Sequence, residues 1–151
     1  MKKQASMFLT LIALVFSLSA WAQKPASPPA KSEGSIDGVK VTIDYAQPSA
    51  KGRKIMGELV PFGEVWRTGA NAVSAIEFGA DVKVEGKALP KGKYGLFTIP
   101  GESEWVIIFS KQNSGSPFDY SDKKDALRVN VKPGKADAFV ETFTKKKKKN
   151  N

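Results

Sequence analysis

The sequence predicts an all-β fold, an antiparallel β-sandwich of the jelly-roll or immunoglobulin-like kind. Turn-forming residues recur about every ten positions, which is the strand spacing of a sandwich or barrel. After residue 22 no apolar pattern with helical spacing continues for three turns. Residues 105–109 are apolar at every position, as in a strand covered on both faces, so two packed sheets are favoured over one open sheet.

The N-terminus has the pattern of a secretory signal peptide. Two early lysines precede an almost wholly apolar stretch at residues 7–18, and an Ala-Trp-Ala site ends at Ala22. We therefore expect residues 1–22 to be removed, a mature chain that starts at Gln23 without a membrane span, and a periplasmic or secreted location. The sequence contains no cysteine, so a lipid anchor on cysteine and disulfides are both excluded.

The mature chain is expected to contain a leader, one domain and a tail. Residues 23–35 are rich in Pro, Ala, Ser and Lys and are interpreted as a disordered linker. The β-sandwich domain spans 36–144, and a Lys/Asn tail spans 145–151. Strands are expected where polar and apolar residues alternate or where apolar runs lie between turns: at 39–45, 72–78, 81–84, 87–89, 94–99, 105–109, 127–131 and 138–143.

The basic character of the chain comes from its two ends. Of the formal net charge of +9, the two lysines of the signal and the five lysines at 145–149 account for seven, which leaves +2 on the body. A nucleic-acid site would need basic residues clustered on a folded face. We therefore expect no nucleic-acid partner.

Residues 61–71 are the stretch most typical of a site, because an aromatic ring, a guanidinium and an amide crowd together without strand periodicity. Gly69 and Asn71 accept positive φ, so a tight bend is expected. If the chain is extended at Trp66 and Arg67, their side chains point to opposite faces. We then expect Trp66 to be mostly buried and the Arg67 guanidinium to be held by hydrogen bonds.

These residues and nearby polar side chains form one set of candidate ligand-binding residues. Arginine suits carboxylates, phosphates and carbonyls because its donors form a rigid fork. The candidates are Arg67, Asn71, Trp66, Thr68, Tyr45, Tyr120 and Arg53. The alternative interpretation is a structural corner, in which the guanidinium ties down a loop, the indole fills the core and the amide serves a turn.

Two runs of the sequence carry a family resemblance. The run GELVPFGEVWRTGAN occupies residues 57–71, and LPKGKYGLFTIP occupies residues 89–100. Together with the intervening residues they resemble the DUF2911 family of bacterial exported proteins of unknown function, over about residues 41–143. The resemblance implies an exported, β-rich domain without an established activity. It brings no catalytic residues, and family members look as though they continue with further strands where this chain has lysines.

Catalytic and metal chemistry find little support in the composition. The sequence contains neither His nor Cys, so Ser-His-Asp and Cys-His machinery are absent, and we expect no metal site and no cofactor. The acidic residues nearest to a Ca²⁺ pattern are Asp119, Asp122 and Asp125, which also suit a solvated loop. A glycosidase would need two carboxylates close together across a cleft. The candidates are Asp44, Glu58, Glu64, Glu102, Glu104 and Asp119, and we assign none of them as catalytic. Tyr94 and Trp105 could stack on a sugar, although strand aromatics are more often core.

Two function classes remain open from the sequence. The favoured one is a non-enzymatic ligand-binding or structural module of the cell envelope, which holds a small anionic or polar ligand or a glycan. The alternative is a small hydrolase or lyase that uses Arg67 with a nearby carboxylate. The two differ in whether a carboxylate lies within hydrogen-bond reach of Arg67 in a concave pocket.

The C-terminal sequence changes character abruptly. The alternation at residues 138–143 predicts a strand that runs directly into five lysines and two asparagines. Such a run is what a stretch of adenines encodes, so one hypothesis is a frameshift that removed the last strands. The alternative is a genuine basic tail, solvated and attracted to anionic surfaces.

Overall fold

The computed structural model describes residues 24–146, so the expected signal peptide and the tail after Lys146 lie outside the described residues. The described chain is all-β and antiparallel, as predicted. Its strands are β1 (Pro29–Ile36), β2 (Val39–Ala46), β3 (Ala75–Phe78), β4 (Val82–Val84), β5 (Lys87–Leu89), β6 (Gly92–Ile99), β7 (Trp105–Ser110) and β8 (Asp125–Val131). Two short 3-10 helices, η2 (Pro117–Asp119) and η3 (Asp122–Lys124), precede β8. Residues 24–146 contain no helix with the length and apolar character needed to span a membrane.

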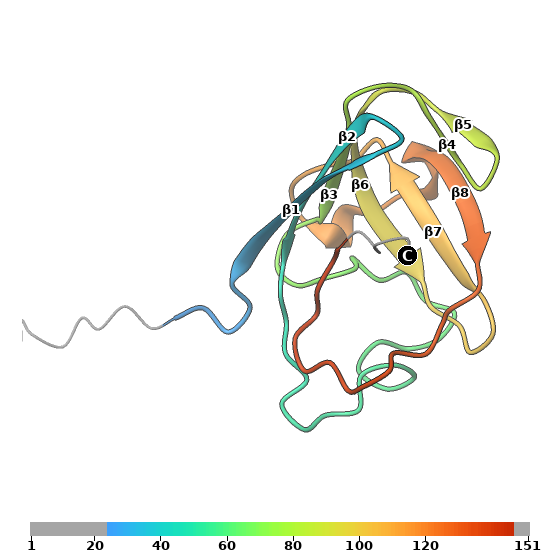
Figure 1. Ribbon diagram of the computed structural model, residues 1–151. Coiled ribbons are helices and arrows are strands. Elements are labelled where there is room, and N and C mark those ends of the chain that lie inside the picture. Colours follow the sequence, from blue (N-terminus) through green and yellow to red (C-terminus); the bar gives the residue numbers. More distant parts are fainter. Residues whose placement is uncertain (1–23, 147–151) are drawn as a thin grey trace, which may run out of the picture.

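Six strands form one large sheet in the order β1-β2-β3-β6-β7-β8, with every neighbouring pair antiparallel (Figure 1). The order follows the chain as in a meander, without the crossing connection of a Greek key among the described strands. The hairpin β4–β5 is inserted between β3 and β6 and forms a separate two-stranded sheet. Its turn is the predicted Glu85-Gly86 pair, and both residues have positive φ, as a tight two-residue hairpin requires.

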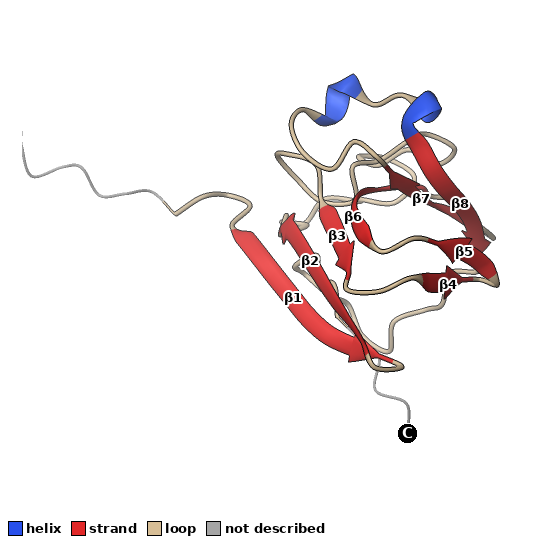
Figure 2. Cartoon of the chain, turned by 90° about the horizontal axis from the view of Figure 1, so that it is seen from above, coloured by secondary structure: helices blue, strands red, loops and turns tan. Residues whose placement is uncertain are grey.

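Apolar side chains cover both faces of the large sheet. On one face, Leu89 of the β4–β5 hairpin is almost fully buried against the sheet. The main cluster there consists of Ile76, Phe78, Leu89, Tyr94, Leu96, Phe109 and Val129. On the other face, Phe97 and Ile108 pack with Val73 and Tyr120. Figure 2 shows the two 3-10 helices, in blue, in the connection before β8. The prediction that residues 105–109 form a strand covered on both sides is therefore confirmed, and the layers are sandwich-like.

The expectation of a disordered linker over residues 23–35 is corrected, because β1 occupies most of it. All eight residues of β1 pair with β2, from Pro29 opposite Ala46 to Ile36 opposite Val39. An edge strand of this kind is stabilised by main-chain hydrogen bonds, so it needs few apolar side chains. Proline is tolerated at the first position of an edge strand, where its missing N–H costs no ladder bond.

The strand expected at residues 138–143 is also corrected. In this segment only one isolated bridge forms, between Thr142 and Ser49. Main-chain hydrogen bonds join the Ala50 N–H to the Glu141 carbonyl and the Phe143 N–H to the Pro48 carbonyl, each at 2.9 Å. The partner segment begins with a proline and then turns away through residues of positive φ at 51 and 52, so it offers no longer ladder.

Candidate functional site

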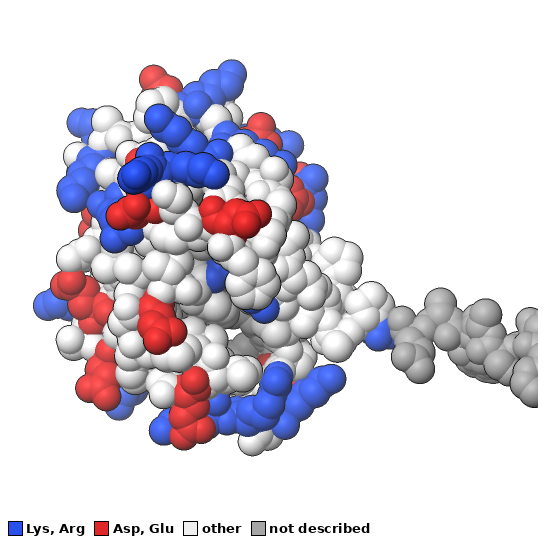
Figure 3. All heavy atoms as spheres, turned by 180° about the vertical axis from the view of Figure 1, so that it is seen from behind, with Lys and Arg blue, Asp and Glu red and all other residues white. Residues whose placement is uncertain are grey.

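The loops beyond one end of the sheet enclose a cavity of about 830 Å³. Its walls come from three segments, residues 48–60, 66–71 and 139–143, together with Ser27. In Figure 1 the teal, green and red loops that contain these segments lie together below the strands. Figure 3 shows the molecule from behind, where the surface is hollowed and atoms of basic side chains lie within a largely uncharged surround. Of the predicted site residues, the cavity brings together Arg53, Trp66, Arg67 and Asn71.

One isolated bridge, to Thr98, fixes Trp66 to strand β6. Its N–H donates to the Thr98 carbonyl at 2.7 Å, and the Thr98 N–H donates back at 2.9 Å. The indole meets the Phe143 ring edge-on, at 5.2 Å between centroids, and lies 6.5 Å from Trp105. Trp66 and Arg67 both line the cavity and both are only partly buried. The expectation of opposite faces is therefore wrong: strand pairing is limited to the single bridge at Trp66, and two residues later Thr68 already has positive φ.

Two residues that follow Arg67 have a backbone in the left-handed region. Thr68 has φ 57° and Asn71 has φ 61°, and for a β-branched residue such a φ is an outlier that costs about 1–3 kcal/mol. Buried hydrogen bonds hold the conformation: the Thr68 hydroxyl donates to the Trp66 carbonyl at 3.1 Å and lies 3.0 Å from the Thr98 hydroxyl. The Ser74 hydroxyl donates to the Thr68 carbonyl at 3.1 Å. Thr68 therefore shapes the site from behind rather than lining the cavity.

Arg67 carries the least satisfied polar group at the cavity. Its Nε is buried without a hydrogen-bond partner, and no residue among 24–146 forms a hydrogen bond or ion pair with its guanidinium. The prediction that hydrogen bonds hold this guanidinium is therefore wrong for the described residues. A buried donor without an acceptor costs about 1–3 kcal/mol. Because the Nε itself is buried, an acceptor brought by a ligand would remove that cost once the Arg67 side chain shifts towards it.

The other two polar side chains of the predicted set at the cavity are already engaged with the main chain. Arg53 donates from Nε to the Ala50 carbonyl and from Nη2 to the Ser49 carbonyl, both at 2.9 Å. Asn71 donates from Nδ2 to the Ser27 carbonyl at 3.3 Å. Arg53 thus ties down its own loop, whereas Arg67, for which the structural interpretation expected this role, does not.

Tyr45 lies behind the cavity, where it meets a residue that the sequence reasoning missed. The Lys145 ammonium donates to the Thr68 carbonyl at 2.6 Å and sits 4.5 Å from the Tyr45 ring centroid and 5.1 Å from that of Phe143. The Lys145 N–H also donates to the Tyr45 hydroxyl at 2.9 Å. Burial lowers the pKa of Lys145 from 10.5 to about 7. A lysine in a terminal run suggests exposure to solvent, and the alternation before it gives no signal of burial, since Phe139 in the same phase is 81% exposed.

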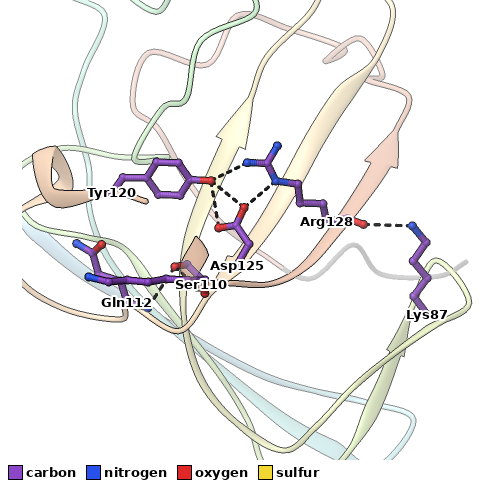
Figure 4. Close-up of polar contacts among 7 residues, drawn as sticks. Lys87, Ser110, Gln112, Tyr120, Asp125 and Arg128 are labelled. Carbon is purple, nitrogen blue, oxygen red and sulfur yellow. Dashed lines mark hydrogen bonds and ion pairs between the residues drawn. The ribbon is translucent and has the colours of Figure 1, made fainter. Parts of the chain in front are cut away.

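Tyr120 is separate from the cavity and belongs to a polar cluster on β8 (Figure 4). Its hydroxyl donates to Asp125 at 2.8 Å and accepts from Arg128 Nη2 at 2.8 Å, while Arg128 Nε contacts the same carboxylate at 2.7 Å. Burial, with a smaller contribution from the Asp125 hydrogen bond, raises the pKa of Tyr120, and the Asp125 hydrogen bond raises the pKa of Arg128. With its ring 4.7 Å from that of Phe97, Tyr120 fastens the η2 loop to the sheet.

Acidic groups do not converge in the described part of the chain. Among residues 24–146 no three His, Cys, Asp or Glu side chains are grouped so as to hold a metal ion. Glu141 is the acidic residue that lines the cavity. Its carboxylate accepts the Lys51 N–H at 2.7 Å and forms no ion pair with Arg67. The cavity therefore contains the unpartnered Arg67 guanidinium, and its described walls hold no acid–base pair beside that group.

Comparisons with known proteins give one match. A family model described as "Protein of unknown function (DUF2911)" matches residues 27–151. No curated protein and no solved structure matches the chain.

Proposed function

The chain belongs to the DUF2911 family, whose description assigns no function. We propose that this protein is a non-enzymatic module that binds a small anionic or polar ligand. The ligand occupies the cavity between residues 48–60, 66–71 and 139–143. Arg67 supplies the charge that holds it, and Trp66 and Asn71 line the cavity around the ligand.

The observation that carries the proposal is the unpartnered Nε of Arg67 at the wall of a cavity. Buried polar groups in folded proteins almost always have a partner, so an orphaned donor calls for an explanation. The strained Thr68, with φ 57°, adjoins Arg67, and strained backbone clusters at ligand sites. A volume of about 830 Å³ also lies within the range of small-molecule sites.

A hydrolase or lyase is the weaker alternative. Acid–base chemistry at Arg67 needs a carboxylate within hydrogen-bond reach. Glu141 is the acid of the cavity wall, and its carboxylate is held by the Lys51 N–H. Nothing among residues 24–146 pairs with Arg67 as an acid or base, so binding is favoured over catalysis.

The proposal includes a location outside the cytoplasm. Residues 1–22 read as a secretory signal peptide with cleavage after Ala22. Mass spectrometry of the protein isolated from the producing cells tests this, because export predicts a chain that starts at Gln23. An intact N-terminus at Met1 in a cytoplasmic fraction would contradict it.

A thermal-shift screen with a library of small anions and polar metabolites tests the binding function. A ligand that binds the native state alone raises the melting temperature. We expect at least one compound to stabilise the wild type and the control Lys132→Gln, which removes an exposed charge outside the cavity lining, while leaving Arg67→Gln unchanged. If no compound stabilises the folded wild type, or if Arg67→Gln responds equally, the proposed function is wrong.

A further inference from the structure

The cavity surrounds its free cation with walls that are mainly apolar. Aliphatic and aromatic side chains dominate the lining, among them Ile55, Met56, Leu59, Val60, Trp66 and Phe143. At the rim, Leu59 is 56% exposed and Phe139 is 81% exposed, so large apolar groups stand open to solvent beside the opening. Sugars and other wholly polar ligands would leave this surface uncompensated. A ligand with an apolar body would cover it.

The cations of the cavity lining differ in whether they already have partners. Arg53 spends two donors on main-chain carbonyls, and Lys54 pairs with Glu58 at 3.4 Å. Arg53 and Lys54 keep their positive charges, and Arg67 is the cation of the lining that has no partner among residues 24–146. The Glu141 carboxylate on the same wall repels additional negative charge. A carboxylate matches the one guanidinium fork without a partner, whereas the second charge of a phosphate monoester would meet only cations that already have partners.

We propose that the ligand of this cavity is an apolar carboxylate, a single carboxylate joined to an alkyl or aryl body. This rests on the proposed binding function and specifies its ligand class. The carboxylate meets the Arg67 guanidinium, and the body runs along the aliphatic wall towards Leu59 and Phe139. Trp66 and Phe143, already in edge-on contact at 5.2 Å, present an aromatic surface to that body.

Calorimetric titration of the purified protein with straight-chain carboxylates provides the test. The series runs from acetate through hexanoate and octanoate to decanoate, each below its micelle concentration. Octanol, which lacks the charge, and inorganic phosphate, which lacks the body, are the comparison ligands. Affinity is expected to rise roughly fourfold with each buried methylene group until the cavity is filled. Octanol should bind roughly tenfold or more weakly than octanoate, because it makes no charge-assisted contact.

Paired variants locate the two halves of the ligand. Arg67→Gln should weaken octanoate binding roughly tenfold or more and leave octanol binding unchanged, whereas Lys132→Gln, at an exposed position outside the cavity lining, should alter neither. Phe139→Ser should weaken decanoate binding several-fold with no effect on acetate. Phe118→Ser is its matched control, because Phe118 is 88% exposed and lies outside the cavity lining.

The outcomes separate this inference from the function on which it rests. If phosphate or acetate binds in an Arg67-dependent way and longer chains bind no better, the binding function stands and the apolar carboxylate is overturned. If octanoate binds equally to wild type and Arg67→Gln, the apolar contact is non-specific and the inference is overturned. If no ligand binds the folded protein, both are overturned.

Discussion

Lys145 gives an unusual stability prediction, because replacing this charged residue should stabilise the protein. The side chain is partly buried behind the cavity without a carboxylate partner among residues 24–146, and burial lowers its pKa from 10.5 to about 7. The variant Lys145→Met keeps the length of the apolar stem and removes the ammonium. Removing the ammonium breaks its hydrogen bond to the Thr68 carbonyl. That carbonyl still accepts a hydrogen bond from the Ser74 hydroxyl, so it is not left without a partner.

The magnitude follows from linkage between protonation and folding. A pKa that falls from 10.5 to about 7 corresponds to a penalty of at most about 5 kcal/mol at neutral and acidic pH. The rings of Tyr45 and Phe143 favour the ammonium by ~0.5–1 kcal/mol each, and the Thr68 carbonyl adds to this. We therefore expect Lys145→Met to raise the free energy of unfolding by ~3 kcal/mol at pH 6.

The pH dependence has a definite sign. Between about pH 7 and 10.5 the unfolded chain holds the Lys145 proton and the folded chain does not, so the stability of the wild type rises with pH across this window. The penalty is fully present below pH 7 and is lost as pH approaches 10.5. The difference between wild type and Lys145→Met should therefore shrink towards zero over the same window.

Urea unfolding followed by tryptophan fluorescence at several pH values between 6 and 10 measures this difference. The exposed neighbour Lys146 supplies the control, since Lys146→Met removes the same charge without relieving burial. A Lys145→Met protein that is less stable than the wild type at pH 6, or a difference that does not change with pH, would refute the reasoning.

Three further predictions concern packing, ligand binding and the polar cluster. Gly95→Ala should abolish cooperative folding in calorimetry, because a Cβ at Gly95 would clash with the Gln112 carbonyl oxygen, while Gly134→Ala, with open space around it, should melt like the wild type. Arg67→Lys should weaken ligand affinity nearly as much as Arg67→Ala in titration calorimetry, because a point charge does not replace a fork; equal affinity of Arg67→Lys and wild type would show that charge alone suffices. Tyr120→Phe should lower the free energy of unfolding in urea by about 1–3 kcal/mol, because hydrogen bonds to a carboxylate and a guanidinium are lost; an unchanged value would remove the cluster from the stability account.

Side-chain patterns predicted the strands that bury a face. The alternation at residues 39–45 and the apolar run at 105–109 correspond to β2 and β7, because burial requires that periodicity. The sequence did not predict β1, because an edge strand pairs through main-chain groups and this pairing leaves little pattern in the side chains. The segment at 138–143 has a strand pattern, but the chain opposite it turns away, and no local pattern reveals a missing partner.

The candidate site was predictable where its residues are close in sequence. Trp66, Arg67 and Asn71 lie within six consecutive residues, and this closeness in the sequence predicted that they line one cavity. The contacts of Lys145 and the distance of Tyr120 from the cavity depend on residues far apart in the chain. Tertiary packing decides such contacts, and periodicity does not encode them.

The central claim is that the Arg67 guanidinium holds the anion, and NMR of arginine side chains tests it most directly. Nitrogen-15 spectra resolve the Nε–H of each arginine, and Arg67→Gln assigns the Arg67 signal by its loss. On titration with octanoate we expect a saturable shift of the Arg67 Nε–H signal, with the signals of Arg53 and Arg128 nearly unchanged. A bound ligand that leaves the Arg67 Nε–H signal in place, or that shifts all arginine signals alike, would contradict the account.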